Sequence, residues 1–535
     1  MTRMSLTGTR LLVRRALRAD RWFWLVWVLV LWSFLPATAS AYRAIISDDA
    51  AGREVAVGLA SNPTMRAILG PPYDLLQVGG FVMWRVGGFV ATCAAIMAAL
   101  GVLRATRAEE EAGRTELLRS GAIGRHASLA AALLTATGAC LLLGLLIAGS
   151  MTGLGTPLTG SLAMGLAIAA TGVVFAGVGA VAAQLTSSAR TARGMAMGAV
   201  GAAYLLRALA DGSSEGSGLR RLGWLSPVEW APYVRPYAGE RWWVLIVPLV
   251  VSAGLVALAI TLESRRDFGA GLRATKPGPA GALAGLRSAG ALAWRLDRGS
   301  VLWSVLGFGI FSLVIGTLSN VFDQVAEDRT LAERFRRMGG GAKLLSDAFY
   351  VAMLGILIVL IALVGLSLLD RLRREEDSGR AELVLSTATS RTALLRAYAV
   401  PALLVPVALV VVSAVLLAVP QAVRDGDPGA LARLAGAGLV QSPGVLLIVA
   451  LAVAVHGLAP RLRWLPWAVT AWSVVVNWIG GVLGFPQRLL DATPFGYLPR
   501  LPADAMSWTP VVVECLVAAV LLAAGWWGYA RRDIT

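Results

Sequence analysis

The sequence predicts an all-α polytopic membrane protein built from two tandem six-helix repeats. Hydrophobic residues make up 57% of the chain and charged residues only 15%. Apolar runs long enough to cross the hydrocarbon core, which takes about 20 residues, recur from one end to the other. These runs favour helices over a barrel, because barrel strands alternate apolar and polar residues and are about 10 residues long.

The apolar runs predict twelve membrane-spanning helices, six in each half. Small residues crowd several of them, which suits close helix packing in lipid. We expect a first half at 1–270, a cytoplasmic linker at 271–282 and a second half at 283–535. The expected spans are 22–42, 81–103, 128–150, 158–185, 194–209, 242–262, 301–320, 349–370, 397–419, 441–460, 464–483 and 510–530.

A repeated polar segment identifies the halves as copies. It runs from Glu109 to Leu117 (EEEAGRTEL) and again from Glu375 to Leu383 (EEDSGRAEL), an offset of 266 positions. The same offset relates Arg265-Arg266-Asp267 to Arg531-Arg532-Asp533. Self-similarity at a fixed spacing is the signature of duplication. Six spans per half give both halves the same orientation, as in parallel transporter repeats.

The distribution of Arg and Lys predicts a multi-pass protein of the plasma (inner) membrane with both termini cytoplasmic. Most of these residues fall in loops that this arrangement places inside, as the positive-inside rule requires. The net charge of +16 then reflects attraction to anionic lipids. No nucleic-acid partner is expected, because the basic residues follow membrane edges and form no single aromatic-studded patch.

The N-terminus permits two interpretations. Basic residues, the apolar run from Trp22 to Leu35 and the small residues Ala37-Thr38-Ala39 are typical of a secretory signal peptide. Four tryptophans in the run, and the matching uncleaved segment at 301–320, favour a retained first span.

The repeated segment follows the second span of each half. One interpretation is a solvated helix that only separates two spans. Duplication favours a docking surface instead: Glu109 and Glu116 are seven residues apart and would share a helix face, as would Glu375 and Glu382. We therefore expect a short surface helix that presents carboxylates and one arginine to a cytoplasmic partner.

An amphipathic segment precedes the first span of each half. Such a pattern is typical of a helix lying in the membrane interface, with lipids as its partners. The basic stripes comprise Arg10, Arg14, Arg18 and Arg21 in the first half and Arg287, Arg295 and Arg298 in the second.

These features resemble the membrane subunits of type-2 ATP-binding-cassette exporters, which carry an elbow helix, six spans and a coupling helix with the motif E-E-x-x-G-R-x-E-L. The duplicated form is similar to actinobacterial polyketide-antibiotic and multidrug permeases. The resemblance covers essentially the whole chain and implies a second, smaller contact near 187–193 and 459–463. The implied coupling residues are Glu109, Glu110, Glu111, Gly113, Arg114, Glu116 and Leu117, with Glu375, Glu376, Asp377, Gly379, Arg380, Glu382 and Leu383.

The family's outer-loop pattern is present only in the first half. It comprises Asn62-Pro63, Gly70-Pro71 and Tyr73-Asp74, followed by Gly79-Gly80-Phe81. The second half shows no such pattern at 334–343.

No nucleotide-binding loop G-x-x-x-x-G-K-[ST] occurs in the sequence, and the longest expected cytoplasmic interval, about 263–300, is too short for an ATPase domain. We therefore expect a transport subunit that is not itself an enzyme and holds no catalytic residue, cofactor or metal. ATP and Mg would be bound by a separate ATP-binding-cassette ATPase, expected as a homodimer on each chain.

Polar and adaptable residues inside the spans are candidates for the substrate path. Intramembrane ionisable groups usually mark function, and Met suits promiscuous sites. Structural alternatives stay open: snorkelling, an ion pair, a helix–helix hydrogen bond or ordinary packing. The candidates are Arg85, Met195, Met197, Tyr204, Trp472, Asn477, Trp478 and Glu514. Outer segments at 224–233 and 493–499, rich in proline and aromatic residues, suit either re-entrant helices or interfacial loops.

The sequence favours ATP-driven export of hydrophobic or amphipathic compounds such as antibiotics. An ion-coupled secondary transporter, and an exporter of lipid or envelope precursors, are the alternatives. A membrane enzyme would need a convergent acid–base or metal cluster at one membrane edge, and none is evident. A channel-like or scaffolding protein is a further alternative.

Overall fold

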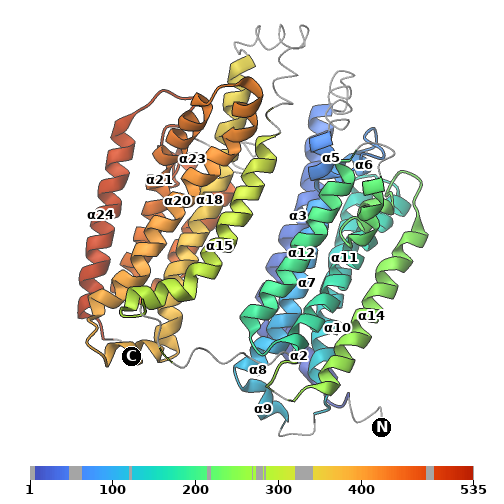
Figure 1. The fold of residues 1–535 in the computed structure, drawn as a ribbon. Coiled ribbons are helices and arrows are strands. Elements are labelled where there is room, and N and C mark those ends of the chain that lie inside the picture. Colours follow the sequence, from blue (N-terminus) through green and yellow to red (C-terminus); the bar gives the residue numbers. More distant parts are fainter. Residues whose placement is uncertain are drawn as a thin grey trace. The chain divides into compact units, whose positions relative to one another are not determined.

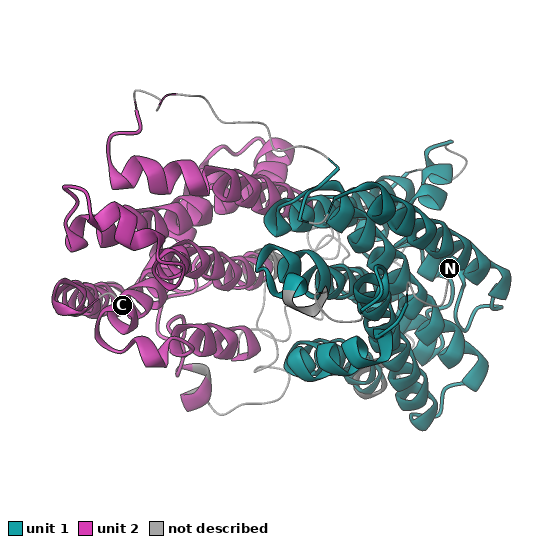
Figure 2. Cartoon of the chain, turned by 90° about the horizontal axis from the view of Figure 1, so that it is seen from below, with its two compact units in different colours: residues 1–278 teal, residues 279–535 magenta. Residues whose placement is uncertain are grey.

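The computed structural model describes residues 6–46, 63–119, 123–213, 218–267, 269–272, 281, 285–317, 319, 342–476 and 487–533. Over these ranges the regular elements are helices and no strand occurs (Figure 1). The chain divides into two compact units, 1–278 and 279–535 (Figure 2). Their boundary falls inside the segment 271–282.

Ten helices of the described residues are long and apolar enough to cross a membrane, so the prediction of an all-α polytopic membrane protein is confirmed. Two other helices occupy the expected fifth and eleventh spans: α12 (Ala189–Asp211), which carries several charges, and α22 (Leu465–Val475). A total of twelve spans stays a prediction. The ten are Arg21–Tyr42, Val78–Glu111, Ala127–Gly153, Leu158–Leu185, Trp242–Arg265, Ala289–Gly316, Phe349–Asp377, Arg391–Asp425, Gly429–Leu458 and Trp508–Arg531.

The first unit begins with the amphipathic helix α2, whose Leu12 is buried beside Ala127 and Ala131 while its arginines stay exposed. After α3 and α5, the chain is helical without interruption from Val78 to Glu111. This long helix contains π-helical turns at Met83–Gly87 and Arg104–Ala108. The helices of this unit are α2 (Thr9–Ala19), α3 (Arg21–Ile46), α5 (Pro63–Leu69), α6 (Val78–Val82), α7 (Gly88–Leu103), α8 (Glu109–Glu111), α9 (Arg114–Arg119), α10 (Ala127–Gly153), α11 (Leu158–Leu185), α12, α13 (Trp230–Tyr233) and α14 (Ile246–Arg265).

Helix α11 forms the centre of the first unit and packs against α7, α10, α12 and α14. Its backbone meets that of α10 where Gly165 faces Gly144, and a Cβ atom at either position would collide with the carbonyl group of the other. Small residues are used in this way because helix association in lipid depends on close packing and not on hydrophobic burial.

The second unit is built around α18, α20 and α21, with α15 packed on α20 and α24 packed on α21. The amphipathic segment and first span of this half form a single helix, α15. The helices are α15 (Ala289–Gly316), α18 (Ala342–Asp377), α19 (Arg380–Leu385), α20 (Arg391–Asp425), α21 (Gly429–Leu458), α22, α23 (Gln487–Leu490) and α24 (Trp508–Arg531).

Replacing Gly144 with leucine should separate α10 from α11 and lower the free energy of unfolding by about 1–3 kcal/mol, the usual cost of overpacking. The measurement is thermal unfolding of the purified protein in detergent. Gly138→Leu in the same helix is the matched control, because nothing lies within 4 Å of a Cβ atom there. Equal stability of the two variants would contradict this account of the contact.

Candidate functional site

The two acidic segments share a helix break that the sequence analysis did not anticipate. Helix α8 ends at Glu111, α9 begins at Arg114, and Gly113 between them has a φ of 71°. Gly379 has the same φ of 71° between α18 and α19. Glycine adopts this left-handed conformation without the steric cost that a Cβ atom brings, so it ends the helix. The prediction that Glu109 and Glu116 share one face of a single helix, and the same prediction for Glu375 and Glu382, are therefore wrong.

An arginine spans the break in each half. Arg114 donates from Nη2 to Glu109 Oε1 at 2.7 Å and from Nε to Oε2 at 3.0 Å. Arg380 donates from Nε to Glu375 Oε2 at 2.7 Å and from Nη2 to Oε1 at 3.3 Å. Such two-pronged arginine–carboxylate pairs fix geometry as well as adding energy. The short helices α9 and α19 are thus braced against the ends of the spans before them.

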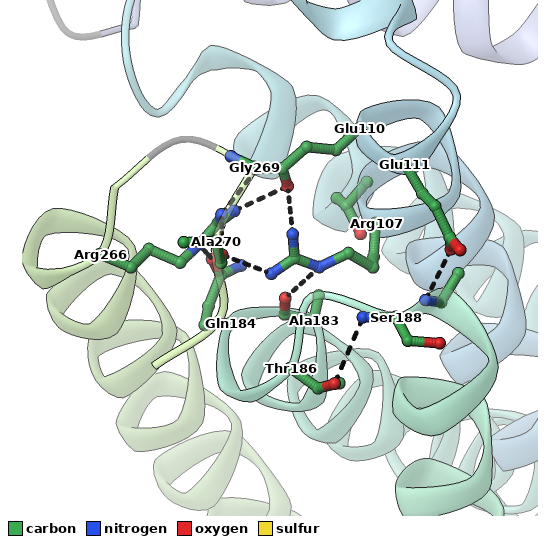
Figure 3. A network of polar contacts seen from close by, with 12 residues as sticks. Arg107, Glu110, Glu111, Ala183, Gln184, Thr186, Ser188, Arg266, Gly269 and Ala270 are labelled. Atoms are coloured by element: carbon green, nitrogen blue, oxygen red, sulfur yellow. Dashed lines mark hydrogen bonds and ion pairs between the residues drawn. The ribbon is translucent and has the colours of Figure 1, made fainter. Parts of the chain in front are cut away.

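The second glutamate of the first segment points inward (Figure 3). Arg266 donates to both oxygens of Glu110, from Nη1 at 2.7 Å and Nη2 at 2.8 Å, and the backbone N–H of Gly269 donates at 2.8 Å. Arg107 Nη1 lies 3.2 Å from Glu110 Oε2. The three charged side chains are 1–7% exposed, so this is a buried ion cluster.

The cluster also holds neighbouring backbone in place. Arg107 donates from Nε to the carbonyl of Ala183 at 2.9 Å and from Nη2 to that of Ala270 at 3.0 Å. Arg266 Nε donates to Gln184 Oε1 at 2.7 Å. The end of α11 and the chain after α14 are therefore fixed to the acidic segment, as Figure 3 shows.

The equivalent glutamate of the second segment, Glu376, is also buried. Arg532 Nη2 donates to its Oε2 at 2.6 Å, and the hydroxyl of Tyr529 donates to its Oε1 at 2.8 Å. His456 Nε2 lies 3.2 Å from the same Oε1. The side chain of Glu376 is only 5% exposed.

The pairs Glu110–Arg266 and Glu376–Arg532 are related by the 266-position offset. The two repeated motifs of each half, the acidic segment and the Arg-Arg-Asp segment, are thus partners. We call each buried pair a terminal clamp, because it ties the segment after the second span to the end of the last one. The sequence analysis found both motifs without pairing them.

The third acidic position differs between the halves. Glu111 accepts a hydrogen bond of 2.8 Å from the backbone N–H of Ala189, at the start of α12, where a negative charge complements the helix dipole. Its counterpart Asp377 lies 3.5 Å from Arg373, with its side chain 65% exposed. The first segment is thus tied to one more helix than the second.

Several of the remaining segment residues are exposed, whereas Thr115 and Ala381 are buried. Glu116 and Glu382 are exposed, as are Arg114 and Arg380, and Leu383 is 71% exposed. The side chain of Leu117 lies outside the described residues.

Ion pairs also connect the start of each half to its second span. Arg15 lies 3.6 Å from Glu109, and Arg104 lies 2.6 Å from Asp20. In the second half, Arg371 lies 2.7 Å from Asp297.

Six of the eight predicted substrate-path residues lie within the described residues, four in the first unit and two in the second. Arg85 is exposed on the π-helical turn, Met195 and Trp472 are 38% and 37% exposed, and Glu514 is buried in α24. Tyr204 donates to the carbonyl of Ile68 at 3.2 Å, and Met197 packs against a cluster of α11 and α12. Asn477 and Trp478 lie outside the described residues. A cavity of about 490 Å³ in the second unit, lined in part by Gln441, Phe495 and Arg500, contains none of these residues.

A buried charged triad of the first unit escaped the sequence analysis. Arg207 Nε lies 3.1 Å from Glu229 Oε2 and 3.4 Å from Asp211 Oδ2, and the three side chains are 0–3% exposed. Burial, with the nearby Asp211 carboxylate, raises the pKa of Glu229 well above its usual range. One feature of the sequence could have indicated this triad. Arg207 and Asp211 are four residues apart at the end of a predicted span, and residues with that spacing share one face of a helix.

Comparison with known proteins identifies the family of the chain over nearly its whole length. Residues 286–530 match the family model described as the C-terminal domain of the multidrug efflux system permease Rv1217c. The multidrug efflux system permease protein Rv1217c of Mycobacterium tuberculosis is 37% identical over 532 residues, covering 99% of this chain and 95% of the relative. The chain belongs to this family of efflux permeases. The expected kinship with export permeases is confirmed, and the chain is a transport subunit.

Removing the clamp carboxylate should destabilise this permease strongly. Glu110→Ala leaves Arg107 and Arg266 buried without their anion, and breaking a buried pair in this way costs about 3–5 kcal/mol. Thermal unfolding in detergent measures the loss. Glu116→Ala, an exposed change in the same segment, should stay within about 0.5 kcal/mol.

The double variant Glu110→Ala/Arg266→Ala should recover part of that stability, since it removes one of the two uncompensated charges. A single Glu110→Ala variant as stable as Glu116→Ala would refute the clamp.

Proposed function

We propose that this permease is the membrane subunit of an ATP-driven exporter of hydrophobic or amphipathic compounds, antibiotics among them. It would lie in the plasma membrane with both termini cytoplasmic. The observation that carries the proposal is the acidic segment that occurs twice, each copy anchored by the same buried Glu–Arg pair. The Mycobacterium tuberculosis relative is named a multidrug efflux system permease, which supports drugs as cargo.

The partner would be a separate ATP-binding-cassette ATPase that binds ATP and Mg. Two equivalent segments suit two equivalent subunits, so we propose an ATPase homodimer on each chain. The outward residues would form the docking surface: Arg114 and Glu116 in the first half, and Arg380, Glu382 and Leu383 in the second.

The inward residues would transmit the movement of the partner. A push on α9 reaches α8 through Glu109–Arg114, α14 through Glu110–Arg266, and α12 through the contact of Glu111 with Ala189. Because these links are short, and the Glu110–Arg266 link is buried, the ends of the helices would move together with the segment. Rigid-body motion of packed elements is a common route by which local events reorient a transporter.

An ion-coupled carrier is the second candidate. It is favoured by the buried carboxyl groups Asp211 and Glu229, which lie beside Arg207 at the outer end of the expected fifth span, since chains of carboxyl groups serve as proton relays in pumps and transporters. The arginine of this triad is not repeated in the second half, where Ser473 stands at the 266-position offset from Arg207.

Charge reversal at the docking surface should release the ATPase. Glu116→Lys combined with Glu382→Lys should weaken copurification of the ATPase about tenfold or more, because like charges across an interface are strongly unfavourable. Membrane insertion and the unfolding temperature should not change, since both side chains are exposed. Asp425→Lys, at the exposed last residue of α20, is the control at another surface and carries half of the charge change. Full association of the double variant would rule out this docking surface.

Export should require both subunits. In a drug-sensitive bacterium, the chain expressed together with its ATPase should lower the accumulation of several bulky amphipathic antibiotics, and the chain alone should not. The physical basis is apolar burial, which contributes about 25 cal/mol per Å² without demanding one shape. Efflux by the chain alone, abolished when the proton gradient is collapsed, would establish the carrier instead.

A further inference from the structure

A polar cavity opens at the terminal clamp of the second unit. It encloses about 590 Å³ among α18, α21, α22 and the end of α24. Its apolar wall includes Leu366, Leu369 and Trp467, and its polar wall includes Arg461 and Arg463. The cavity is thus amphipathic, with apolar and cationic sides.

The corresponding place in the first unit is filled. Arg107, the counterpart of Arg373 in the cavity wall, is 1% exposed and donates to the carbonyl of Ala270. Leu272 donates its backbone N–H to the carbonyl of Gln184. Between them, Gly271 lies so close to the backbone of Thr186 that a Cβ atom could not fit. In the first unit, the residues that follow the last span therefore occupy this place.

The cationic side of the cavity is not neutralised. Arg461 and Arg463 are both exposed, and among the described residues neither has an ion pair or hydrogen bond. The carboxylates that line the cavity already contact other arginines. These contacts are Glu376 with Arg532, Asp377 with Arg373, Asp370 with Arg374 and Asp533 with Arg391. Two unpaired guanidinium groups therefore face the opening.

We propose that this cavity binds an anionic phospholipid. Arg461 and Arg463 would hold its phosphate, since guanidinium groups form paired hydrogen bonds with phosphate oxygens. An acyl chain would follow Leu366, Leu369 and Trp467. Basic pockets between membrane helices suit such headgroups, and Trp467 and the 58% exposed Trp464 are typical of the membrane–water interface.

The proposal rests on the proposed function in one respect only. Cytoplasmic termini would assign the lipid to the cytoplasmic leaflet, whereas binding itself requires no ATPase. The segment 459–463 was also expected to contact the ATPase, so lipid binding and ATPase association are measured separately.

The test uses the full chain in detergent, without the ATPase, titrated with phosphatidylglycerol or phosphatidylcholine and followed by native mass spectrometry. Phosphatidylglycerol should bind preferentially. Arg461→Ala/Arg463→Ala should weaken its binding about 30-fold, the effect expected of two basic residues at an anionic headgroup. Ala452→Trp, which fills the cavity without changing its charges, should weaken binding as well.

The matched control is Arg190→Ala/Arg193→Ala, which removes two exposed arginines from the first turns of α12 in the first unit, and it should bind phosphatidylglycerol normally. Equal loss in both double variants would mean diffuse surface attraction and would overturn the site. Competition by inorganic phosphate at equal concentration would overturn the lipid as the ligand. Unchanged phosphatidylglycerol binding with lost ATPase association would assign the arginines to the ATPase and refute the proposal.

Discussion

In each half, a glutamate–arginine pair joins the acidic segment to the end of the last span, and the position of that segment depends on this interaction. Removing a carboxylate from water is costly, and only close, well-hydrogen-bonded geometry offsets that cost. Glu110 meets the requirement with two arginines and a backbone N–H, and Glu376 with Arg532, Tyr529 and His456. Because these partners come from the last span and the adjoining helices, the acidic segment cannot tilt independently of the bundle.

The helical architecture was predictable because a bilayer imposes a simple length rule on apolar runs. The fourth expected span, 158–185, coincides with α11. The break at Gly113 was missed because a seven-residue spacing was given more weight than the glycine inside it. The rule that glycine in a left-handed conformation ends helices would have placed it correctly. The eleventh span cannot be compared along its full length, since residues 477–486 are not described.

The sequence predicted where the candidate site lies, in the two acidic segments, but it did not predict which side chains contact one another there. Repetition drew attention to Glu110 and Arg266 separately, yet they are 156 positions apart and nothing local links them. The inward or outward direction of neighbouring glutamates depends on which arginine the fold brings near. For the same reason the triad of Arg207, Asp211 and Glu229 was not predicted: Glu229 reaches it from a different element.

The buried Arg207 of the first half, which has Ser473 as its counterpart in the second, has a consequence for how such proteins evolve. If a six-helix half assembled as a homodimer, every substitution would appear on both sides of the complex, and the two sides could not differ at this position. Joining the halves in one gene removes that constraint. One copy can then keep an ancestral structural role while the other accumulates substitutions for a new ligand, without a second gene or a mechanism to sort unlike subunits.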